Sequence, residues 1–305
     1  MKKKRKPHSI GSLGEFGLIE SVRSSFKGHP DLVCGPGDDC AVIKRDSRRY
    51  DLLTCDMLVE GVDFKRTHDP LLVGRKAVNV SLSDIAACAG LPRFCLVSLG
   101  LAPDVSVTYV RRLTEGTRRA CEAFEVTLAG GDVSRASQTV IDVSMYGVVE
   151  KRNLALRSGA RPGDFIFVTG PLGGAAAGGH LTFTPRIKEA RLLSEAVRIH
   201  AMCDISDGLA QDLGHIVRSS RVGALIYEEL IPLRKEAKGL RDALYSGEDF
   251  QLLFTVGRRD AKKLLRANGE YAFPIGEIAG KKRAVTLIAS SGKVRVLDEK
   301  GFRHF

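Results

Sequence analysis

The 305-residue sequence contains no tryptophan, and aromatic residues make up only 6% of it. A protein that stacks several nucleic-acid bases needs exposed aromatic side chains, so this composition argues against such a surface. No apolar run reaches the roughly 20 residues that cross a bilayer. The basic amino-terminal segment lacks the apolar centre of a secretory signal peptide. We therefore expect a cytoplasmic protein with no membrane segment.

The sequence also lacks any C-x-x-C pair, and its cysteines are odd in number, at seven. Structural zinc sites and disulfide frameworks are usually built from paired, regularly spaced cysteines. Most of the cysteines here lie in apolar runs, where a free thiol behaves as a small hydrophobic side chain. The sequence therefore predicts buried free thiols at most of these positions, which are Cys34, Cys40, Cys55, Cys88, Cys95, Cys121 and Cys203.

Neither of the common phosphate-binding loops is present, because the chain has no G-x-x-x-x-G-K-S/T motif and no strand followed by G-x-G-x-x-G. The glycine-rich stretch 169–179 is a weak candidate, and its glycines fit close packing of a helix on a sheet better. Without a phosphate-loop lysine, we expect metal ions and an arginine to neutralise bound phosphate. Arg157, near the junction of the two halves of the chain, is the best-placed arginine; a solvated linker charge is the alternative.

The net charge is +11, but five of the positive charges lie in the stretch Lys2–Lys6. We expect residues 1–12 to form a disordered basic tail. The other basic residues are interspersed with acidic ones, so we expect small polyanionic ligands and no specific nucleic-acid partner.

Predicted strands and helices alternate in both halves of the chain, which indicates an α/β or α+β fold. The charged segment 151–164, punctuated by glycine and proline, is the predicted boundary between domains 13–150 and 151–305. Periodicity predicts helices at 13–27, 70–89, 106–124, 170–179, 186–200 and 209–218. It predicts strands at 41–43, 52–58, 94–101, 126–128, 140–150, 165–169, 224–227, 250–256, 273–278 and 284–289.

Several acidic residues sit in otherwise small or apolar stretches. Asp39 ends the turn 35–39, Asp56 closes a predicted strand, Asp84 lies in a predicted helix, and Asp132 follows Gly131 at a predicted strand end. Asp204 and Asp207 flank Ser206 before another helix. Carboxylates are rarely buried unless they are paired or bind a metal, and a set of oxygen ligands favours Mg²⁺. Taken one by one, these residues also fit ordinary turns, a helix contact and a helix N-cap.

Together these blocks resemble the thiamine-monophosphate kinase family of the aminoimidazole-ribonucleotide synthetase-like ATP-binding superfamily. The matching segments run in family order from about residue 13 to the C-terminus and are 37–41, 56–64, 76–87, 129–132, 157–164, 204–216, 246–250 and 301–305. The resemblance implies a two-domain fold with mixed sheets flanked by helices. It also implies a homodimer that transfers the γ-phosphoryl group of ATP to thiamine monophosphate, with several Mg²⁺ ions.

The resemblance also implies roles for individual residues. The expected metal shell is Asp39, Thr54, Cys55, Asp56, Asp84, Asp132, Asp204 and Asp207, with a backbone carbonyl serving at Cys55, where the family often has threonine. Gly131, Asp132, Arg157 and Ser206 are expected to contact ATP, and Arg157 and Asp207 to act in catalysis. The expected acceptor contacts are Asp63, Glu248 and Glu299. Because phosphoryl transfer depends on positioning and charge neutralisation, we expect direct in-line transfer without a phosphoenzyme.

The chain departs from the family pattern at three places. Asp63 stands where the family often has histidine, and Glu299 stands where an aromatic residue is often found. The segment between Gly179 and Pro185 is shorter than usual. The alternatives are therefore a kinase or synthetase of the same superfamily with another phosphorylated acceptor, or a non-catalytic ATP sensor. A nucleic-acid binder would differ from both by a steep salt dependence that is lost without residues 2–6.

Overall fold

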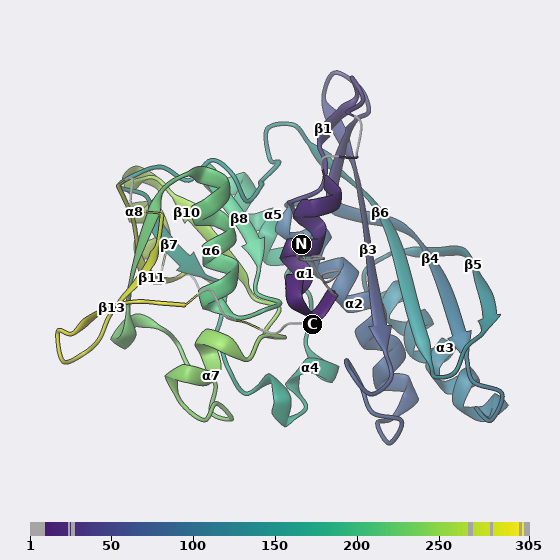
Figure 1. The fold of residues 1–305 in the computed structure, drawn as a ribbon. Helices are drawn as coiled ribbons and strands as arrows, with labels where there is room; N and C mark the ends of the chain where they lie inside the picture. Colours follow the sequence, from purple (N-terminus) through teal and green to yellow (C-terminus); the bar gives the residue numbers. More distant parts are fainter. Residues whose placement is uncertain are drawn as a thin grey trace, which may run out of the picture.

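The computed structural model describes residues 10–23, 25, 28–267, 271–280, 283–298 and 301. Within these residues the chain forms one six-stranded and one seven-stranded sheet with helices packed around them (Figure 1). The fold is therefore mixed α and β, as predicted. No helix in this described part is long and apolar enough to cross a membrane.

The first sheet has the order β1-β2-β3-β6-β4-β5 and is antiparallel except for the parallel pair β4 and β5. Over most of its length β6 alternates buried and half-buried side chains, the pattern of a sheet with one well-covered face. The strands are β1 (Leu32–Cys34), β2 (Ala41–Lys44), β3 (Arg49–Val59), β4 (Leu91–Leu101), β5 (Thr127–Arg135) and β6 (Val140–Glu150).

Helix α2 (Pro70–Ala87) is the centre of the structure, and α3 (Val107–Ala123) lies beside it. Asp69 begins α2 as an N-cap, since its side chain accepts a hydrogen bond from the Leu71 N–H and a proline follows it. Helix α2 covers one face of the first sheet and also contacts β8, α4 and α5 of the second half. Almost every residue of α2 after Val73 is buried, so its polar side chains must find partners inside the protein.

The second sheet has the order β13-β12-β9-β11-β7-β10-β8 and is antiparallel except between β9 and β12. Both of its faces are buried: Phe167 and Phe254 face the core around α2, and Ile166 and Leu253 face the core beneath α6. Its strands are β7 (Phe165–Val168), β8 (Ile199–Asp204), β9 (Gly223–Tyr227), β10 (Leu252–Val256), β11 (Phe273–Ala279), β12 (Val285–Ile288) and β13 (Val294–Val296).

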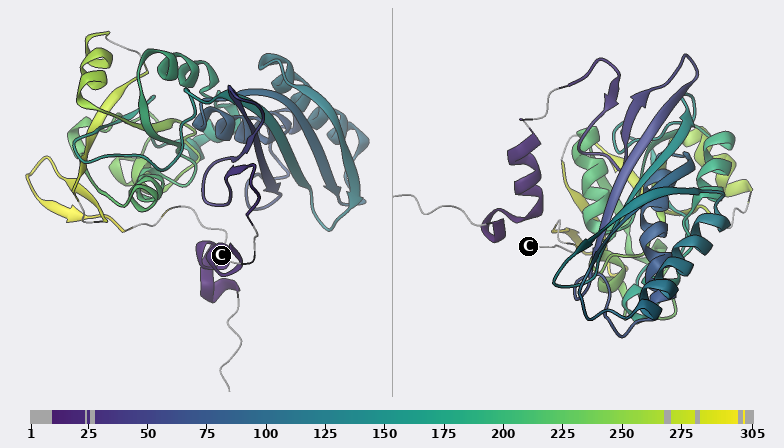
Figure 2. Two further views of the ribbon diagram at one scale, coloured as in Figure 1. Left: turned by 90° about the horizontal axis from the view of Figure 1, so that it is seen from above. Right: turned by 90° about the vertical axis from the view of Figure 1, so that its right-hand side faces the viewer.

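The remaining helices flank this second sheet. They are α4 (Gly179–Thr182), α5 (Ile187–Ala196), α6 (Leu209–Ser220), α7 (Leu240–Tyr245) and α8 (Arg258–Arg266), with 3₁₀ turns η1 (Ala175–Ala177) and η2 (Glu228–Leu230). Helix α1 (Ile10–Arg23) lies apart from both sheets in the two views of Figure 2. Because α1 begins at Ile10, the predicted tail 1–12 is too long by three residues, and residues 1–9 lie outside the described part.

Two helix predictions are wrong in the second half. The predicted helix 170–179 is a turn followed by η1, because Gly173 and Gly174 have φ values of +80° and +78° that no α-helix contains. The predicted helix 186–200 ends at Ala196, and Ile199–Asp204 forms β8 instead. Strand β8 pairs with β10, so tertiary pairing overrides the local helical periodicity.

Two acidic residues expected at strand ends lie inside strands. Asp56 is followed by three further residues of β3, which stay paired with β6 as far as Val59. Asp132 is followed by three residues of β5, which stay paired with β4 as far as Arg135. Long-range pairing extends both strands beyond their apolar runs.

Candidate functional site

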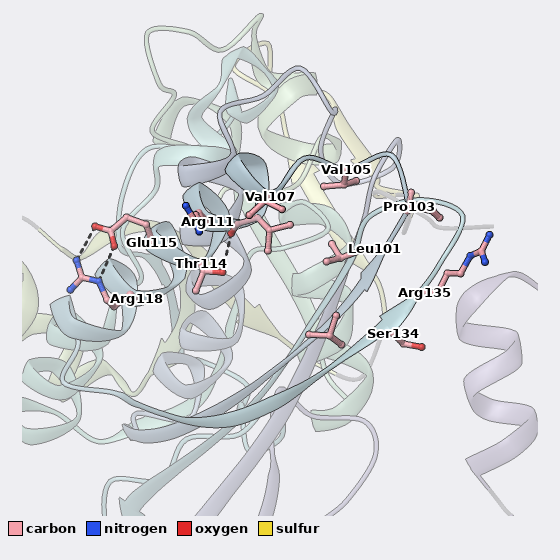
Figure 3. A pocket seen from close by; sticks show the side chains of 13 residues that line it. Leu101, Pro103, Val105, Val107, Arg111, Thr114, Glu115, Arg118, Ser134 and Arg135 are labelled. Carbon is pink, nitrogen blue, oxygen red and sulfur yellow. Dashed lines mark hydrogen bonds and ion pairs between the residues drawn. The ribbon is translucent and has the colours of Figure 1, made fainter.

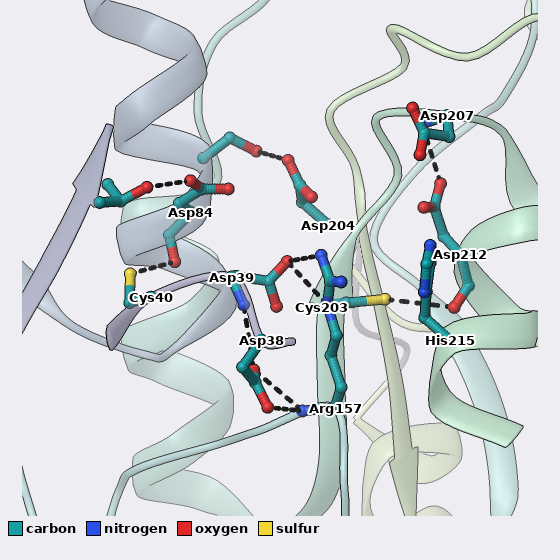
Figure 4. Close-up of polar contacts among 12 residues, drawn as sticks. Asp38, Asp39, Cys40, Asp84, Arg157, Cys203, Asp204, Asp207, Asp212 and His215 are labelled. Carbon is teal, nitrogen blue, oxygen red and sulfur yellow. Dashed lines mark hydrogen bonds and ion pairs between the residues drawn. The ribbon is translucent and has the colours of Figure 1, made fainter. Parts of the chain in front are cut away.

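Three carboxylates from distant parts of the sequence converge between the two sheets. Asp39 precedes β2, Asp84 lies in α2, and Asp204 ends β8. Each offers an oxygen, and these oxygens lie within 4.8 Å of one another (Figure 4). The convergence predicted from sequence is therefore present for these three residues, and both halves of the chain contribute to it.

Hydroxyl groups hold the carboxylates in place. Thr54 donates a hydrogen bond to the Asp84 carboxylate, Ser83 donates to Asp204 at 2.6 Å, and Ser81 donates to Asp56 at 2.8 Å. Ser81, Ser83 and Asp84 all belong to α2. This one helix therefore positions Asp56 of β3 on one side and Asp204 of β8 on the other.

Arg157 is the cation next to this cluster. Its Nη2 lies 2.7 Å from Oδ1 of Asp39, and its backbone N–H donates to the carboxylate of Asp38 (Figure 4). Burial and the charge of Asp39 raise the pKa of Asp38 to about 7. Asp39 Oδ2 is buried and has no hydrogen-bond partner among the described residues. The arginine thus neutralises one oxygen of Asp39 and leaves the other without a partner.

The electrostatics of the cluster favour a bound cation. Burial and then repulsion from Asp39 raise the pKa of Asp204 to about 7, and burial also raises the pKa of Asp56 to about 6. Burial and the charge of Asp56 raise the pKa of Asp84 well above its usual value. Such shifts mean that the carboxylates cannot all be charged at neutral pH unless a cation joins them. The all-oxygen donors and the unpartnered Asp39 Oδ2 therefore fit Mg²⁺.

A second polar group lies at the start of α6. Asp207, Asp212 and His215 bring their ligand atoms within 4.8 Å of one another. Asp212 accepts hydrogen bonds from the backbone N–H groups of Asp207 and Gly208, so it caps the helix from within. Burial, with the nearby charges of two arginines, lowers the pKa of His215 to about 3. The histidine is therefore neutral at physiological pH.

The predicted ATP contact Ser206 and acceptor contact Glu248 are neighbours, since the Glu248 N–H donates to the Ser206 carbonyl at 2.7 Å. The Glu248 side chain forms an ion pair with buried Lys76 of α2. The Asp63 carboxylate accepts a hydrogen bond from the Val59 N–H at 2.7 Å, and its carbonyl faces Lys76. Glu299 lies outside the described residues.

Gly131 and Asp132 are on β5, away from the three converging carboxylates. Asp132 on β5 pairs with Ser98 on β4, and Ser98 pairs with Asp142 on β6. Asp142 in turn pairs with Met57 on β3, which follows Asp56 in the sequence, so these four paired residues face the same side of the sheet. Successive residues of a strand face opposite sides, so Asp132 is on the other side of the sheet from Asp56. Exposed Cys55 also lies on this outer side.

The glycine-rich stretch 169–179 is occupied by its own carboxylates. The Gly173 N–H donates to both oxygens of Asp249 at 2.9 Å, and the Gly174 N–H donates to Asp242 at 2.8 Å. A phosphate loop needs free N–H groups. These amides are therefore structural, as the packing interpretation of the sequence favoured.

Two hollows in the surface differ in whether predicted site residues line them. One of about 670 Å³ is lined by Asp39, Thr54 and Cys55 together with apolar side chains of the outer sheet face. Another of about 870 Å³ lies between α3 and the ends of β4 and β5 (Figure 3). None of the predicted site residues lines this second hollow, and its acidic residue Glu115 pairs with Arg118 at 2.8 Å. Of these two hollows the first alone touches predicted site residues, and Asp84 and Asp204 line neither.

Sequence reasoning missed several polar residues of the site. Lys76, Ser81 and Ser83 are buried in α2, where they are separated by small or apolar residues and by Asn79. The signal that identified the aspartates, a polar residue inside an apolar run, applies equally to them. Asp142 carries the same signal between Ile141 and Val143, but its position beside Cys55 and Asp56 depends on pairing between β6 and β3.

Comparison with known proteins agrees with this geometry. The N-terminal and C-terminal domain models of the AIR synthase related proteins match residues 37–149 and 161–288. The thiamine-monophosphate kinase of Aquifex aeolicus is 37% identical over 81% of this chain and 87% of its own. That of Bacillus subtilis is 32% identical over 96% of this chain and 100% of its own.

A solved structure described as "AaThiL complexed with AMPPCP and TMP" superimposes with a TM-score of 0.86 at 32% identity, covering 99% of this chain and 100% of that one. The similarity thus extends over both sheets. The chain belongs to the thiamine-monophosphate kinase family of the AIR synthase related proteins.

Proposed function

We propose that this protein transfers the γ-phosphoryl group of ATP to thiamine monophosphate, giving thiamine diphosphate and ADP. The observation that carries the proposal is the convergence of Asp39, Asp84 and Asp204 beside Arg157. Relatives along almost the whole chain are named for this reaction, and one of them has been solved with an ATP analogue and TMP.

The residues that would hold Mg²⁺ are those of the carboxylate cluster and its neighbours. They are Asp39, Thr54, Cys55, Asp56, Asp84, Asp204 and Asp207, with Cys55 acting through its backbone carbonyl. Asp132 would bind a metal from the outer side of the first sheet, apart from this cluster. When bound, Mg²⁺ neutralises and orients the ATP phosphates. Among the residues of the chain, Arg157 supplies a positive charge for the transferring group, and Gly131 and Ser206 contact the nucleotide.

The acceptor lies on the side of the cleft where Asp63, Glu248 and Glu299 are expected. Its phosphate is already ionised, so an acceptor oxygen attacks the γ-phosphorus of ATP directly and the bond to the ADP oxygen breaks in line. No proton has to be removed by a strong base, and no covalent phosphoprotein forms. Asp207 assists as a charged group beside the nucleotide. Trapping of a phosphorylated protein during turnover would contradict this step.

We also infer a cytoplasmic homodimer that forms through the outer face of the first sheet. Leu53, Met57, Phe94 and Leu96 lie on this face, and each is between 44% and 57% exposed. A contiguous patch of large apolar side chains on a sheet is typical of an interaction surface. Phe94 stacks on Tyr146 across two strands, which gives the patch a rigid aromatic centre.

The test is product formation with Mg²⁺-ATP and three conditions: thiamine monophosphate, free thiamine and no acceptor. We expect thiamine diphosphate and equimolar ADP from the monophosphate alone. Binding of ATP without acceptor-dependent ADP release would instead indicate a sensor. ADP release stimulated by a different phosphorylated compound would reassign the acceptor while keeping the kinase chemistry.

A further inference from the structure

Lys76 is a fully buried lysine in the middle of α2, with no exposed surface. A lysine ammonium has three N–H donors and no acceptor. In this structure its Nζ lies 2.7 Å from the Asp63 carbonyl, 3.0 Å from His180 Nδ1, and in an ion pair with Glu248. All three donors are therefore used.

These three contacts join three separate segments. Asp63 belongs to the turn after β3, His180 to α4, and Glu248 to the loop after α7. Because the ammonium can only donate, His180 Nδ1 accepts from it, and the neutral ring carries its proton on Nε2. With its donors occupied by protein groups, Lys76 has none left for a phosphate oxygen.

Glu248 is held at both ends. Its backbone has φ +57°, in the left-handed region, and its N–H is bonded to Ser206. One carboxylate oxygen pairs with Lys76, and the other lies 3.5 Å from His180 Nδ1. The side chain is still 31% exposed, so it faces the open part of the site. A buried ammonium requires an anionic partner, which keeps this carboxylate in one orientation.

We propose that Lys76 is a positioning residue for the acceptor: it fixes the Glu248 carboxylate, which binds the cationic or amino-bearing part of the acceptor molecule. This inference rests on the proposed function, in which thiamine monophosphate carries a positively charged ring and an amino group. Lys76 acts through Glu248 and does not touch the transferring phosphate.

The test is a double-mutant cycle of K76M, E248Q and K76M/E248Q, with the KM for thiamine monophosphate and the KM for Mg²⁺-ATP measured separately. We expect K76M to raise the acceptor KM about tenfold or more and to change the ATP KM by less than about twofold. The double variant should be no worse than E248Q, because both substitutions remove the same interaction. The matched control is K263M, which breaks an exposed pair with Asp260 on α8 and should leave both constants unchanged.

Effects that multiply in the double variant, or equal rises in both KM values, would overturn the proposal. Should K76M fail to fold, K76R keeps the charge but cannot place three donors in the same positions. K76R should then raise the acceptor KM selectively, and an unchanged KM would contradict the proposal. Turnover by the unmutated protein tests the proposed function by itself, so the two failures are distinguishable.

Discussion

Arg157 Nη2 and Asp39 Oδ1 are 2.7 Å apart, and this ion pair connects the linker between the two halves to the turn before β2. The Asp39 side chain has no exposed surface. Asp39 is also an expected metal ligand. When no metal is bound, Arg157 is therefore the cation that neutralises the Asp39 carboxylate.

Arg157→Ala should destabilise the metal-free protein by about 3–5 kcal/mol, because it leaves a buried carboxylate without its cation. Mg²⁺ should restore much of that stability, whereas kcat should fall about 100-fold or more since the transferring group loses a positive charge. Thermal unfolding with EDTA and with Mg²⁺ checks the first part. Arg45→Ala, which breaks the exposed pair with Asp51, is the control and should cost at most about 1 kcal/mol. Equal destabilisation with and without Mg²⁺ would count against the metal assignment.

Asp84→Asn should separate stability from metal binding. The asparagine keeps an oxygen that can accept the Thr54 hydrogen bond but removes one of the repelling charges. We therefore expect the metal-free variant to unfold at the same or a higher temperature than the unmutated protein. Its activity should fall about 100-fold or more. The Mg²⁺-induced rise in melting temperature should disappear, and a variant that keeps the full rise would show that Asp84 is not a ligand.

The stability of the metal-free protein should decrease as pH rises from about 4 to about 7. In the folded state the pKa of Asp204 is raised to about 7 and that of Asp56 to about 6, against a value of 3.8 for a free aspartate. Between these values the folded state binds more protons than the unfolded state, so unfolding becomes easier with each rise in pH. Mg²⁺ should reverse this, and its stabilising effect should be larger at pH 8 than at pH 5. Calorimetry between pH 4 and pH 8, with and without Mg²⁺, measures this stability. A stabilising effect of Mg²⁺ that is equal at pH 5 and pH 8 would contradict the prediction.

Gly131→Ala should disrupt the first sheet whether or not Gly131 contacts ATP. A Cβ atom there would lie 1.8 Å from the Val97 carbonyl oxygen of the adjoining strand. Overpacking of this kind costs about 1–3 kcal/mol or more. Gly280→Ala is the matched control, since nothing lies within 4 Å of its added Cβ. A stable Gly131→Ala protein with impaired ATP binding would instead favour a role in the nucleotide contact alone.

Leu96→Glu should convert the inferred dimer to a monomer without unfolding it, because Leu96 is already half exposed on the outer face of the first sheet. Light scattering after size-exclusion chromatography measures the mass. Leu265→Glu places the same charge at a similarly exposed position on α8 and should leave the mass unchanged. An unmutated protein that is itself monomeric would reject the dimer.

The parts of the fold that follow local rules were predictable from sequence. Helix α2 and strand β6 agree with their predicted ranges to within two residues, since each has a long and clear apolar pattern. The predicted helix 186–200 runs two residues into strand β8, because the pairing of β8 with β10 is not visible in its own residues. Likewise Asp56 and Asp132 were assigned to strand ends, but pairing to distant strands carries β3 and β5 further.

The candidate site also contains residues that the sequence identifies and residues that only the fold identifies. An aspartate inside an apolar stretch is conspicuous, which is why Asp39, Asp84 and Asp204 could be named before their convergence was seen. The partners of those aspartates depend on where α2 packs, so the roles of Ser81, Ser83 and Lys76 could be read only from the fold. The position of Asp132 on the outer side of the sheet depends on β4 and β5 being parallel neighbours.

The turn at Gly173 and Gly174 bears on how the protein distinguishes forms of its nucleotide. Asp249 and Asp242 already accept hydrogen bonds from the Gly173 and Gly174 N–H groups, and Asp39, Asp84 and Asp204 bring further carboxylates together from both halves of the chain. A bare nucleotide would meet like charge there, with Arg157 as its counterion already paired to Asp39. Under the proposed function this arrangement favours the magnesium complex of ATP over the free anion, and we expect the concentration of free divalent cation to set how much of the nucleotide the protein can use.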